Sequence, residues 1–395
     1  MTIFLEYLAG LAAAVLLIPV TVLFLEVLSS VRRTKKHPQA IQERPRLAVL
    51  MPAHNEASII ATSLRTVTPQ LSGRDRILVV ADNCSDDTPA IAEAEGAEVI
   101  LRTDLVRRGK GFALDFGVRH LEGDPPDIVM IIDADCVVTA GTIDTLARLC
   151  AQTRQPVQAL YLMRTASGAS VSLRIAEFAF LVKNQVRPMG LRHLGLPCQL
   201  MGTGMAFPWR CISTASLASG HIVEDLKLGI ELARRGDFPL FCPEALVTST
   251  FAASSEGSQS QRTRWEHGHI GVILSDAPRL FLDSVMKFDV RLASLALDLA
   301  VPPLSLLALA NVLVWIGGGI LFVSTKLAIP LLIATISISL LTLAVFVAWG
   351  RYGRRVISLA DLGLAMYYAI KKIPLYARFL VTRQMEWVRS KRDDE

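Results

Sequence analysis

The chain has 395 residues, of which 52% are hydrophobic and 19% are charged, and its formal net charge is +5. This composition, with a mean hydropathy of +0.42, excludes a disordered chain and argues against an ordinary soluble enzyme. The small net charge disfavours a nucleic-acid-binding protein. The six cysteines include no C-x-x-C pair, which favours buried, reduced thiols over a disulfide framework or a zinc site.

Three apolar windows are long enough to cross a bilayer, which takes about 20 residues. The first lacks a basic leader region and a clear cleavage site, so we expect an uncleaved anchor (1–31) rather than a signal peptide. Only Ser324–Lys326 separates the other two, which predicts a helical hairpin over 299–350 in which Asn311 bonds a neighbouring helix. The windows are 7–25, 299–323 and 327–350.

Basic clusters at 32–36 and 351–355 follow the first and third windows. Because the cytoplasmic flanks of membrane helices are rich in Lys and Arg, both clusters predict cytoplasmic positions. We therefore expect a multi-pass protein of the plasma membrane, which is the inner membrane in bacteria. Its N-terminus would lie outside, and a basic linker (32–45) would lead to a cytoplasmic globular domain (46–278).

Two further segments, 279–298 and the tail 351–395, mix basic residues with apolar and aromatic ones at helical spacing. This pattern predicts amphipathic helices that lie in the membrane interface, in contact with lipids. The alternative for both segments is packing on the globular domain.

Between residues 46 and 278, short apolar runs alternate with helical patterns. One helix is expected over 56–68, with Asn55 as its N-terminal cap. Strands that alternate with helices of about ten residues predict an α/β fold with a mostly parallel, doubly wound sheet. The expected strands are 47–51, 76–81, 98–101 and 127–132, and further helices are expected over 86–95 and 111–120.

Polar clusters end three of these strands, namely Asn55–Glu56, Asp82–Asn83 and Asp133–Asp135. Parallel strands bring their carboxyl ends to one edge of the sheet, where ligands bind, so the clusters should share a site. A nicotinamide-dependent oxidoreductase is disfavoured, because the first strand leads into PAHNEA rather than G-x-G-x-x-G. A P-loop enzyme is disfavoured because Gly109–Gly111 lacks the rest of a Walker A motif.

Asp133 and Asp135 are separated by one residue at the end of an apolar strand. In an extended chain such positions project to the same side, so two like charges lie together. A divalent cation that also binds phosphate oxygens fits this arrangement, since Mg²⁺ commonly uses one or two carboxylates and substrate phosphates. The alternative is that both carboxylates cap a helix expected at 142–150.

Two further motifs follow along the chain. Glu224–Asp225 precedes a helix expected at 226–234, and the Q-x-x-R-W motif (residues 261–265) follows a Ser-rich stretch typical of a mobile loop. Together with Asp82 and the D-x-D motif, these ordered signatures make residues 45–270 resemble a family 2 glycosyltransferase of the GT-A type. The chain is similar to the membrane-embedded cellulose, hyaluronan, chitin and poly-N-acetylglucosamine synthases and to related exopolysaccharide glycosyltransferases.

The resemblance implies a metal-dependent donor site for a UDP-sugar. Asp82 would hold the uracil or the ribose, and Asp135 would ligate Mg²⁺ or Mn²⁺. Gln261, Arg264 and Trp265 would belong to a gating loop that closes over the diphosphate and the acceptor. Arg264 suits a diphosphate because its planar guanidinium makes paired bonds. Lys110 adds a second cation, with a solvated loop lysine as the alternative. The expected donor-binding residues are Ala53, Glu56, Asp82, Lys110, Asp133, Gln261 and Arg264.

The resemblance likewise implies an acceptor side. Asp225 would be the general base, and Glu224 is second to it because helix capping explains it equally well. The segment Gly202, Thr203, Gly204 occupies the place of the family's glycine loop, and Trp265 would stack on a sugar ring or be a core aromatic. A single base without a protein nucleophile predicts inversion. Two departures are VED in place of TED and a glycine loop without aromatic residues, and the second puts polymer binding in doubt.

These features predict an inverting hexosyltransferase that adds a sugar to a polyprenyl-diphosphate-linked glycan during cell-surface or exopolysaccharide synthesis. The alternative is a processive polysaccharide synthase, but three membrane crossings are few for a polymer channel. Export proteins are possible partners. A non-catalytic scaffold is disfavoured by the intact motifs, and a transporter by the few charges in the membrane windows.

Overall fold

The computed structural model describes residues 2–32, 44–251 and 255–381. Parts of the predicted basic linker (33–43) and tail (382–395) lie outside these residues. The chain divides into two compact units, which we call the sheet unit and the helical unit. Of the described residues, the sheet unit comprises 44–164, 197–251 and 255–268, and the helical unit comprises 2–32, 165–196 and 269–381.

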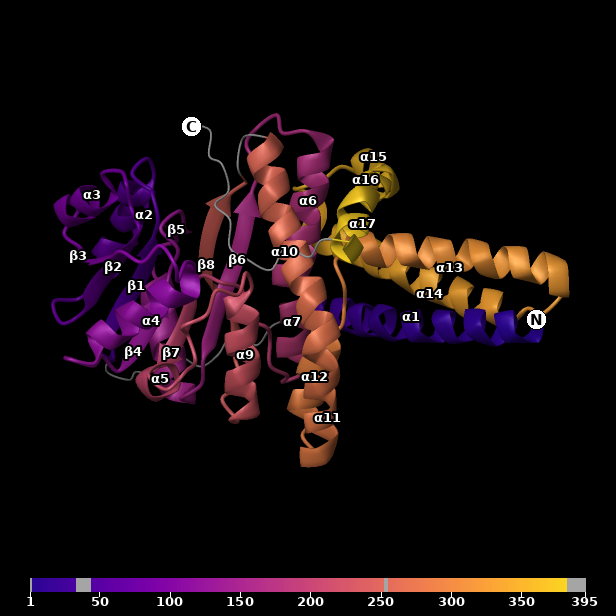
Figure 1. The fold of residues 1–395 in the computed structure, drawn as a ribbon, viewed down its shortest axis with the longest axis horizontal. Coiled ribbons are helices and arrows are strands. Elements are labelled where there is room, and N and C mark those ends of the chain that lie inside the picture. The colour runs from indigo at the N-terminus through magenta and orange to yellow at the C-terminus, as the bar shows by residue number, and fades with distance from the viewer. Residues whose placement is uncertain (1, 33–43, 252–254, 382–395) are drawn as a thin grey trace. The chain divides into compact units, whose positions relative to one another are not determined.

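The sheet unit is built on an eight-stranded sheet in the order β3-β2-β1-β4-β7-β6-β8-β5 (Figure 1). β1, β2, β3 and β4 pair in parallel, whereas β7 runs antiparallel to β4 and β6. This arrangement confirms the predicted α/β sheet of GT-A type. The strands are β1 (Leu47–Ala53), β2 (Arg76–Asp82), β3 (Glu98–Arg102), β4 (Ile128–Ile131), β5 (Val137–Val138), β6 (Val157–Arg164), β7 (Met205–Pro208) and β8 (Leu240–Thr250).

Alternating side chains of the strands explain how helices cover this sheet. Leu50, Leu78 and Val129 belong to a buried cluster with residues of α4, α8 and α9. Their neighbours along each strand point to the opposite face, because successive strand residues alternate. The helices are α2 (Ile60–Val67), α3 (Thr88–Ala94), α4 (Lys110–Leu121), α5 (Thr142–Thr153), α8 (Trp209–Ile212) and α9 (Glu224–Arg234).

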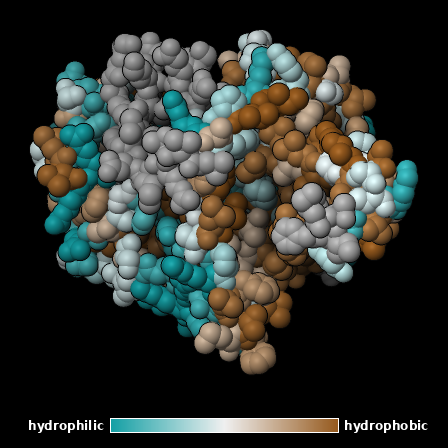
Figure 2. All heavy atoms as spheres, turned by 45° about the vertical axis from the view of Figure 1, so that its right-hand side comes forward, coloured by the Kyte–Doolittle hydropathy of each residue, from teal (hydrophilic) through white to brown (hydrophobic). Residues whose placement is uncertain are grey.

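The helical unit contains the predicted membrane segments. Within the described residues, three helices are long and apolar enough to cross a membrane: Glu6–Ser30, Leu304–Thr325 and Ile329–Gly353. They correspond to α1 (Thr2–Ser30), α13 (Leu304–Thr325) and α14 (Ile329–Ala348), the last extended by a π-helical turn. Ser337 donates a hydrogen bond of 2.6 Å to Asn311, which confirms that Asn311 bonds a neighbouring helix. Hydrophobic side chains cover much of the right-hand half of Figure 2, where these helices come forward.

A buried ionic cluster joins three helices of this unit. The guanidinium of Arg187 donates to Glu26 Oε2 at 2.7 Å and to Asp298 Oδ1 at 2.5 Å, and all three residues are at most 5% exposed. α1 and α7 approach closely here, since a Cβ at Gly190 would lie 1.9 Å from the carbonyl oxygen of Glu26. The helices concerned are α1, α7 (Arg187–His193) and α12 (Val290–Leu299), and α7 continues α6 (Val171–Leu181) through a π-helical turn.

Three local predictions differ from the structure. The helix expected from 56 begins only at Ile60, because Asn55 has a left-handed φ of 53° and ends β1 in a turn instead of capping α2. The Q-x-x-R-W motif, expected in a loop, lies in α10 (Ser255–Ser275). The segment 279–298 forms two helices, α11 (Ala277–Lys287) and α12, because Phe288 adopts a left-handed conformation between them.

The remaining helices of the helical unit follow α14. They are α15 (Leu359–Gly363), α16 (Ala365–Lys371) and α17 (Ile373–Val381). Lys371 and Lys372 lie over the rings of Tyr367 and Tyr368 at 4.5 and 4.8 Å. Along α11 and α12, Leu282, Met286, Phe288 and Val290 are exposed. The interfacial position of both segments stays a prediction.

Candidate active site

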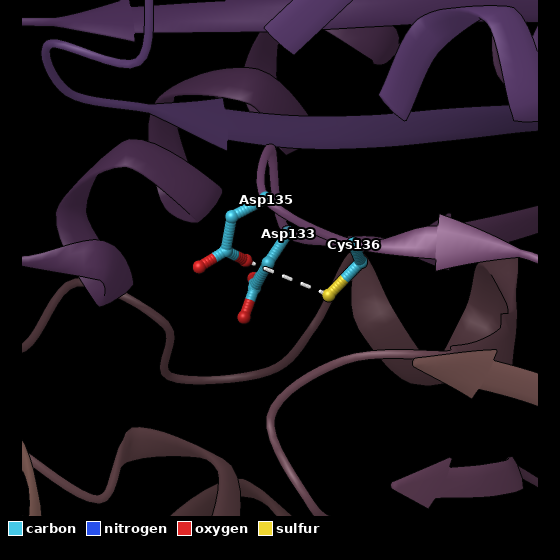
Figure 3. Close-up of side chains that lie close together, drawn as sticks. All are labelled: Asp133, Asp135 and Cys136. Carbon is cyan, nitrogen blue, oxygen red and sulfur yellow. Dashed lines mark hydrogen bonds between the residues drawn. The ribbon is translucent and has the colours of Figure 1, made fainter. Parts of the chain in front are cut away.

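Asp133 and Asp135 follow β4 at the carboxyl edge of the sheet. Their carboxylates lie side by side (Figure 3), and with the Cys136 thiol they offer ligand atoms within 4.8 Å of one another. Burial and both nearby carboxylates raise the pKa of Cys136 well above its usual range, so the sulfur is a neutral thiol. The available hard donors are therefore carboxylate oxygens, which suit Mg²⁺ or Mn²⁺ better than a soft metal.

Lys110 supplies the positive charge at this position. It is the first residue of α4, and its ammonium contacts Asp133, donates 2.7 Å to the carbonyl of Gly202 and lies 3.8 Å from Glu224. Burial opposes the charge of Lys110, but the carboxylates of Asp133 and Glu224 outweigh it and raise its pKa. Burial raises the pKa of Asp133, and Lys110 opposes that shift. The solvated-lysine alternative is wrong, since the Lys110 side chain is only 19% exposed.

Glu224 and Asp225 begin α9 beside this lysine. Burial raises the pKa of Glu224 to about 8. The positive charge of Lys110 lowers this pKa, and the carboxylate of Asp225 raises it by a smaller amount. A Cβ placed on Gly202 would lie 3.5 Å from Asp225 Oδ2 and 3.8 Å from Lys110 Nζ, so Gly202 faces both. The structure thus brings the D-x-D motif, Lys110, the VED acids and the glycine loop together.

The glycine loop is held by a residue that the sequence analysis missed. Gln158, fully buried on β6, accepts from the N–H of Met201 at 2.8 Å and donates to the carbonyl of Thr203 at 2.9 Å. The hydroxyl of Thr203 in turn accepts from the N–H of Asp133 at 3.0 Å. No sequence signal marks Gln158, because its role depends on how β6 passes the loop.

Gly202 and Gly204 have φ values of 88° and 65°, a region that disfavours side chains. At Gly204 a Cβ would also lie only 2.9 Å from the Ala159 side chain. Both positions therefore require glycine, and the loop lies directly against the acids.

Asp82 lies at the same carboxyl edge, at the end of β2, and pairs with Arg102 at the end of β3. The two residues are in register on parallel strands, and Arg102 Nη1 donates to Asp82 Oδ1 at 2.6 Å. Burial raises the pKa of Asp82, and Arg102 opposes the shift. Arg102 was not predicted as a site residue. Asp82 and Arg102 each directly follow an expected strand, and neighbouring parallel strands bring such residues together, so the sequence did contain a signal.

The loops after β1 and β2 interlock around Ala53 and Glu56. Thr88 accepts from the N–H of Glu56 at 2.7 Å, and Asn55 accepts from the N–H of Ser85 at 2.7 Å. Positive φ values at Asn55 and Asn83, which asparagine tolerates better than most residues, allow both turns. The first two polar clusters of the sequence thus meet at one edge of the sheet, as predicted.

α10, the helix that carries the Q-x-x-R-W motif, comes close to the VED motif at Gly268. A Cβ on Gly268 would lie 2.6 Å from Val223 Cγ1, so α10 passes Val223 at a distance that only glycine permits. Burial lowers the pKa of Arg264, and the carboxylate of Glu224 opposes this. Trp265 is half-buried. The side chain of Gln261 lies outside the described residues, so its predicted place is not observed.

The comparisons with known proteins agree with this geometry. The family model described as "Glycosyltransferase like family 2" matches residues 45–268, which is more than half of the chain. The chain belongs to this family. In this family 2 glycosyltransferase, the acids of the candidate site all lie within the matched residues.

Two curated relatives of this family 2 glycosyltransferase match over part of their lengths. Probable glycosyltransferase YdaM of Bacillus subtilis is 25% identical over 277 residues, which is 63% of this chain and 61% of YdaM. Glucosyl-3-phosphoglycerate synthase of Mycobacterium tuberculosis is 35% identical over 97 residues, which is 23% of this chain and 29% of the synthase. The chain thus spans less than two thirds of either relative.

A solved structure shares the fold over almost the whole chain. The mannosyltransferase PcManGT from Pyrobaculum calidifontis, in complex with GDP-Man and Mn²⁺, superposes with a TM-score of 0.59 at 16% identity. The match covers 96% of this chain and 100% of PcManGT. It includes the membrane-type helices that flank the glycosyltransferase region.

Proposed function

We propose that this glycosyltransferase transfers a sugar from a UDP-sugar, with inversion, to a polyprenyl-diphosphate-linked glycan in cell-surface or exopolysaccharide synthesis. The supporting observation is the meeting of Asp133, Lys110, Glu224 and Asp225 around Gly202. Such a set combines a cation for a diphosphate with a carboxylate for an attacking hydroxyl. Nucleotide-sugar transfer needs both kinds of group.

The residues present fit a divalent cation. Asp135 and Asp133 offer neighbouring carboxylate oxygens, the donor type that Mg²⁺ and Mn²⁺ prefer. When bound, the ion would neutralise charge on the leaving diphosphate. PcManGT holds Mn²⁺ together with its nucleotide sugar, which supports the same pairing here.

The chain's own cations would complete the donor side. Lys110, already next to Asp133, and Arg264, near Glu224, would meet the diphosphate oxygens and stabilise their charge. Asp82 would contact the uridine, beside Ala53 and Glu56 on the interlocked loops. Gln261 would join this set from α10.

Asp225 would act as the general base. It would take the proton from the acceptor hydroxyl while the hydroxyl oxygen bonds the anomeric carbon and the bond to the diphosphate breaks. Attack from the face opposite the leaving group inverts the anomeric centre. Gly202, Thr203 and Gly204 would line the acceptor side, Trp265 would stack on a sugar ring, and Glu224 would support the base.

The three apolar helices favour an acceptor in the membrane. The basic clusters after α1 and α14 favour a cytoplasmic glycosyltransferase domain, where UDP-sugars are made. Since the chain supplies few crossings for a polymer channel, we favour transfer of one sugar over processive synthesis.

The test uses the full chain in detergent with a panel of UDP-sugars and polyprenyl-diphosphate-linked acceptors, with product masses as the readout. One added sugar that disappears with a metal chelator and returns with Mn²⁺ is the expected result. A ladder of products would contradict single transfer. Turnover that survives complete metal removal would contradict the metal assignment.

A further inference from the structure

Within the described part of the chain, only one of the two carboxylate oxygens of Asp82 accepts side-chain hydrogen bonds. Oδ1 accepts from Arg102 at 2.6 Å and from the Asn83 side chain at 3.0 Å. In the described part of the chain, Oδ2 accepts no hydrogen bond, and about 10% of the Asp82 side chain stays exposed. Oδ1 is therefore held by the protein, whereas Oδ2 is available to a ligand.

The side chain of Arg102 is itself held in place, so it can keep Asp82 in this orientation. Its Nη2 donates to the carbonyl of Arg107 at 2.8 Å and to Asp104 at 3.2 Å, and its guanidinium lies 5.6 Å from the centre of the Phe112 ring. The side chain is only 9% exposed. Turning Asp82 to present Oδ1 instead would break a short, charge-assisted bond in a largely buried place.

We propose that Arg102 is a positioning residue that makes Oδ2 of Asp82 a single hydrogen-bond acceptor, and that this acceptor selects uracil over cytosine in the donor nucleotide. The inference rests on the proposed function, in which Asp82 meets the uridine. Uracil offers an N–H at position 3, whereas cytosine has a lone pair there. The carboxylate bonds the first and repels the second.

The expected preference for UDP over CDP follows from the free energy that is lost when a charged group lacks its hydrogen bond. Hydrogen bonds to charged groups contribute about 1.5–3 kcal/mol, so losing one weakens binding by roughly 10- to 100-fold. UDP should therefore bind the wild-type protein about tenfold or more tightly than CDP. Nucleotide binding, measured by calorimetry on the full chain in detergent with Mn²⁺, separates this preference from turnover.

Asp82→Asn gives the sharpest test, because Arg102 determines how the amide is oriented. The guanidinium and Asn83 both donate, so the amide oxygen takes the place of Oδ1 and the NH₂ group takes the place of Oδ2. The ligand then meets a donor where it met an acceptor. The ratio of UDP to CDP affinity should shift toward CDP by about tenfold or more.

Arg102→Lys tests the positioning itself. A lysine keeps the charge but lacks the fork that holds one oxygen, so the preference for UDP should fall while Mn²⁺ binding is kept. Arg76→Lys is the matched control, because Arg76 pairs with Glu98 at 2.9 Å between the same two strands, at their opposite ends. That variant should retain the wild-type preference.

The outcomes separate the inference from the proposed function. If the wild type binds neither nucleotide, the proposed function fails. If it binds UDP and CDP equally, or if Asp82→Asn weakens both alike, as a ribose contact would predict, the inference is wrong and the proposed function stands. Because the wild-type ratio alone can contradict the inference, a variant that does not fold leaves it testable.

Discussion

The ammonium of Lys110 lies 3.8 Å from the carboxylate of Glu224 and at the same time contacts Asp133. One cation from the start of α4 therefore serves an acid at the end of β4 and an acid at the start of α9. Two acids this close are costly to ionise together, and Lys110 supplies a counter-charge that both share. Lys110 is thus the electrostatic centre of the candidate active site.

Replacing Lys110 by methionine should lower kcat by about 100-fold or more, the typical loss on removing one preorganised charge. Lys110→Arg, which keeps the charge, should retain more activity. Steady-state kinetics on both variants test this, with near-UV circular dichroism as the control for folding. Equal activity of Lys110→Met and wild type would show that the lysine is only a surface cation.

Asp225→Asn should abolish transfer while nucleotide binding stays unchanged, because the amide cannot accept the hydroxyl proton. General bases contribute about 10²–10⁴-fold to rate. Glu231→Gln is the control, since Glu231 lies on the same helix and pairs instead with Arg235 at 2.6 Å. Near-normal turnover of Asp225→Asn would refute the assignment of the base.

Glu224 predicts a pH effect on stability. Burial raises its pKa from 4.5 to about 8, so between these values the folded chain holds a proton that the unfolded chain releases. Its contribution to the free energy of unfolding therefore falls as pH rises through this range. Thermal unfolding of metal-free protein should show a smaller loss of stability between about pH 5 and about pH 8 in Glu224→Gln than in wild type. Identical pH dependences would contradict the raised pKa.

Gly268→Ala should reduce transfer strongly, because the added methyl group would lie 2.6 Å from Val223 Cγ1 and push α10 away from the VED motif. Gly271→Ala is a matched control on the same helix, since nothing lies within 4 Å of its Cβ position. The control should keep activity and gain about 1 kcal/mol of helix stability. Equal activity of the two variants would place α10 outside the site.

The local order of the sheet unit could be predicted from the sequence. The expected strands at 47–51, 76–81 and 98–101 lie within β1, β2 and β3, because apolar runs between helical patterns predict buried parallel strands. The polar clusters that follow β1, β2 and β4 reach one edge for the same reason. α4 and α5 also begin within a residue of the predicted positions.

The partners of these residues could not be predicted, because they depend on contacts between distant segments. Lys110 meets Asp133 and Gly202 only when α4, β4 and the glycine loop have packed together. The partners of Arg187 are equally distant in the sequence, because it is buried between Glu26 and Asp298, more than 100 residues away on either side. The loop expected at Q-x-x-R-W also failed, because polar composition alone does not exclude a helix.

The pairing of Arg187 with Glu26 and Asp298 has a consequence for protein engineering. Trimming the chain from Met1 to Val31 to obtain a water-soluble enzyme would remove one partner of this arginine, and ending it before α12 would remove the other. Breaking a buried ion pair typically costs 3–5 kcal/mol. A truncated chain would need an apolar residue in place of Arg187. Otherwise the segments that carry Glu26 and Asp298 would have to be kept.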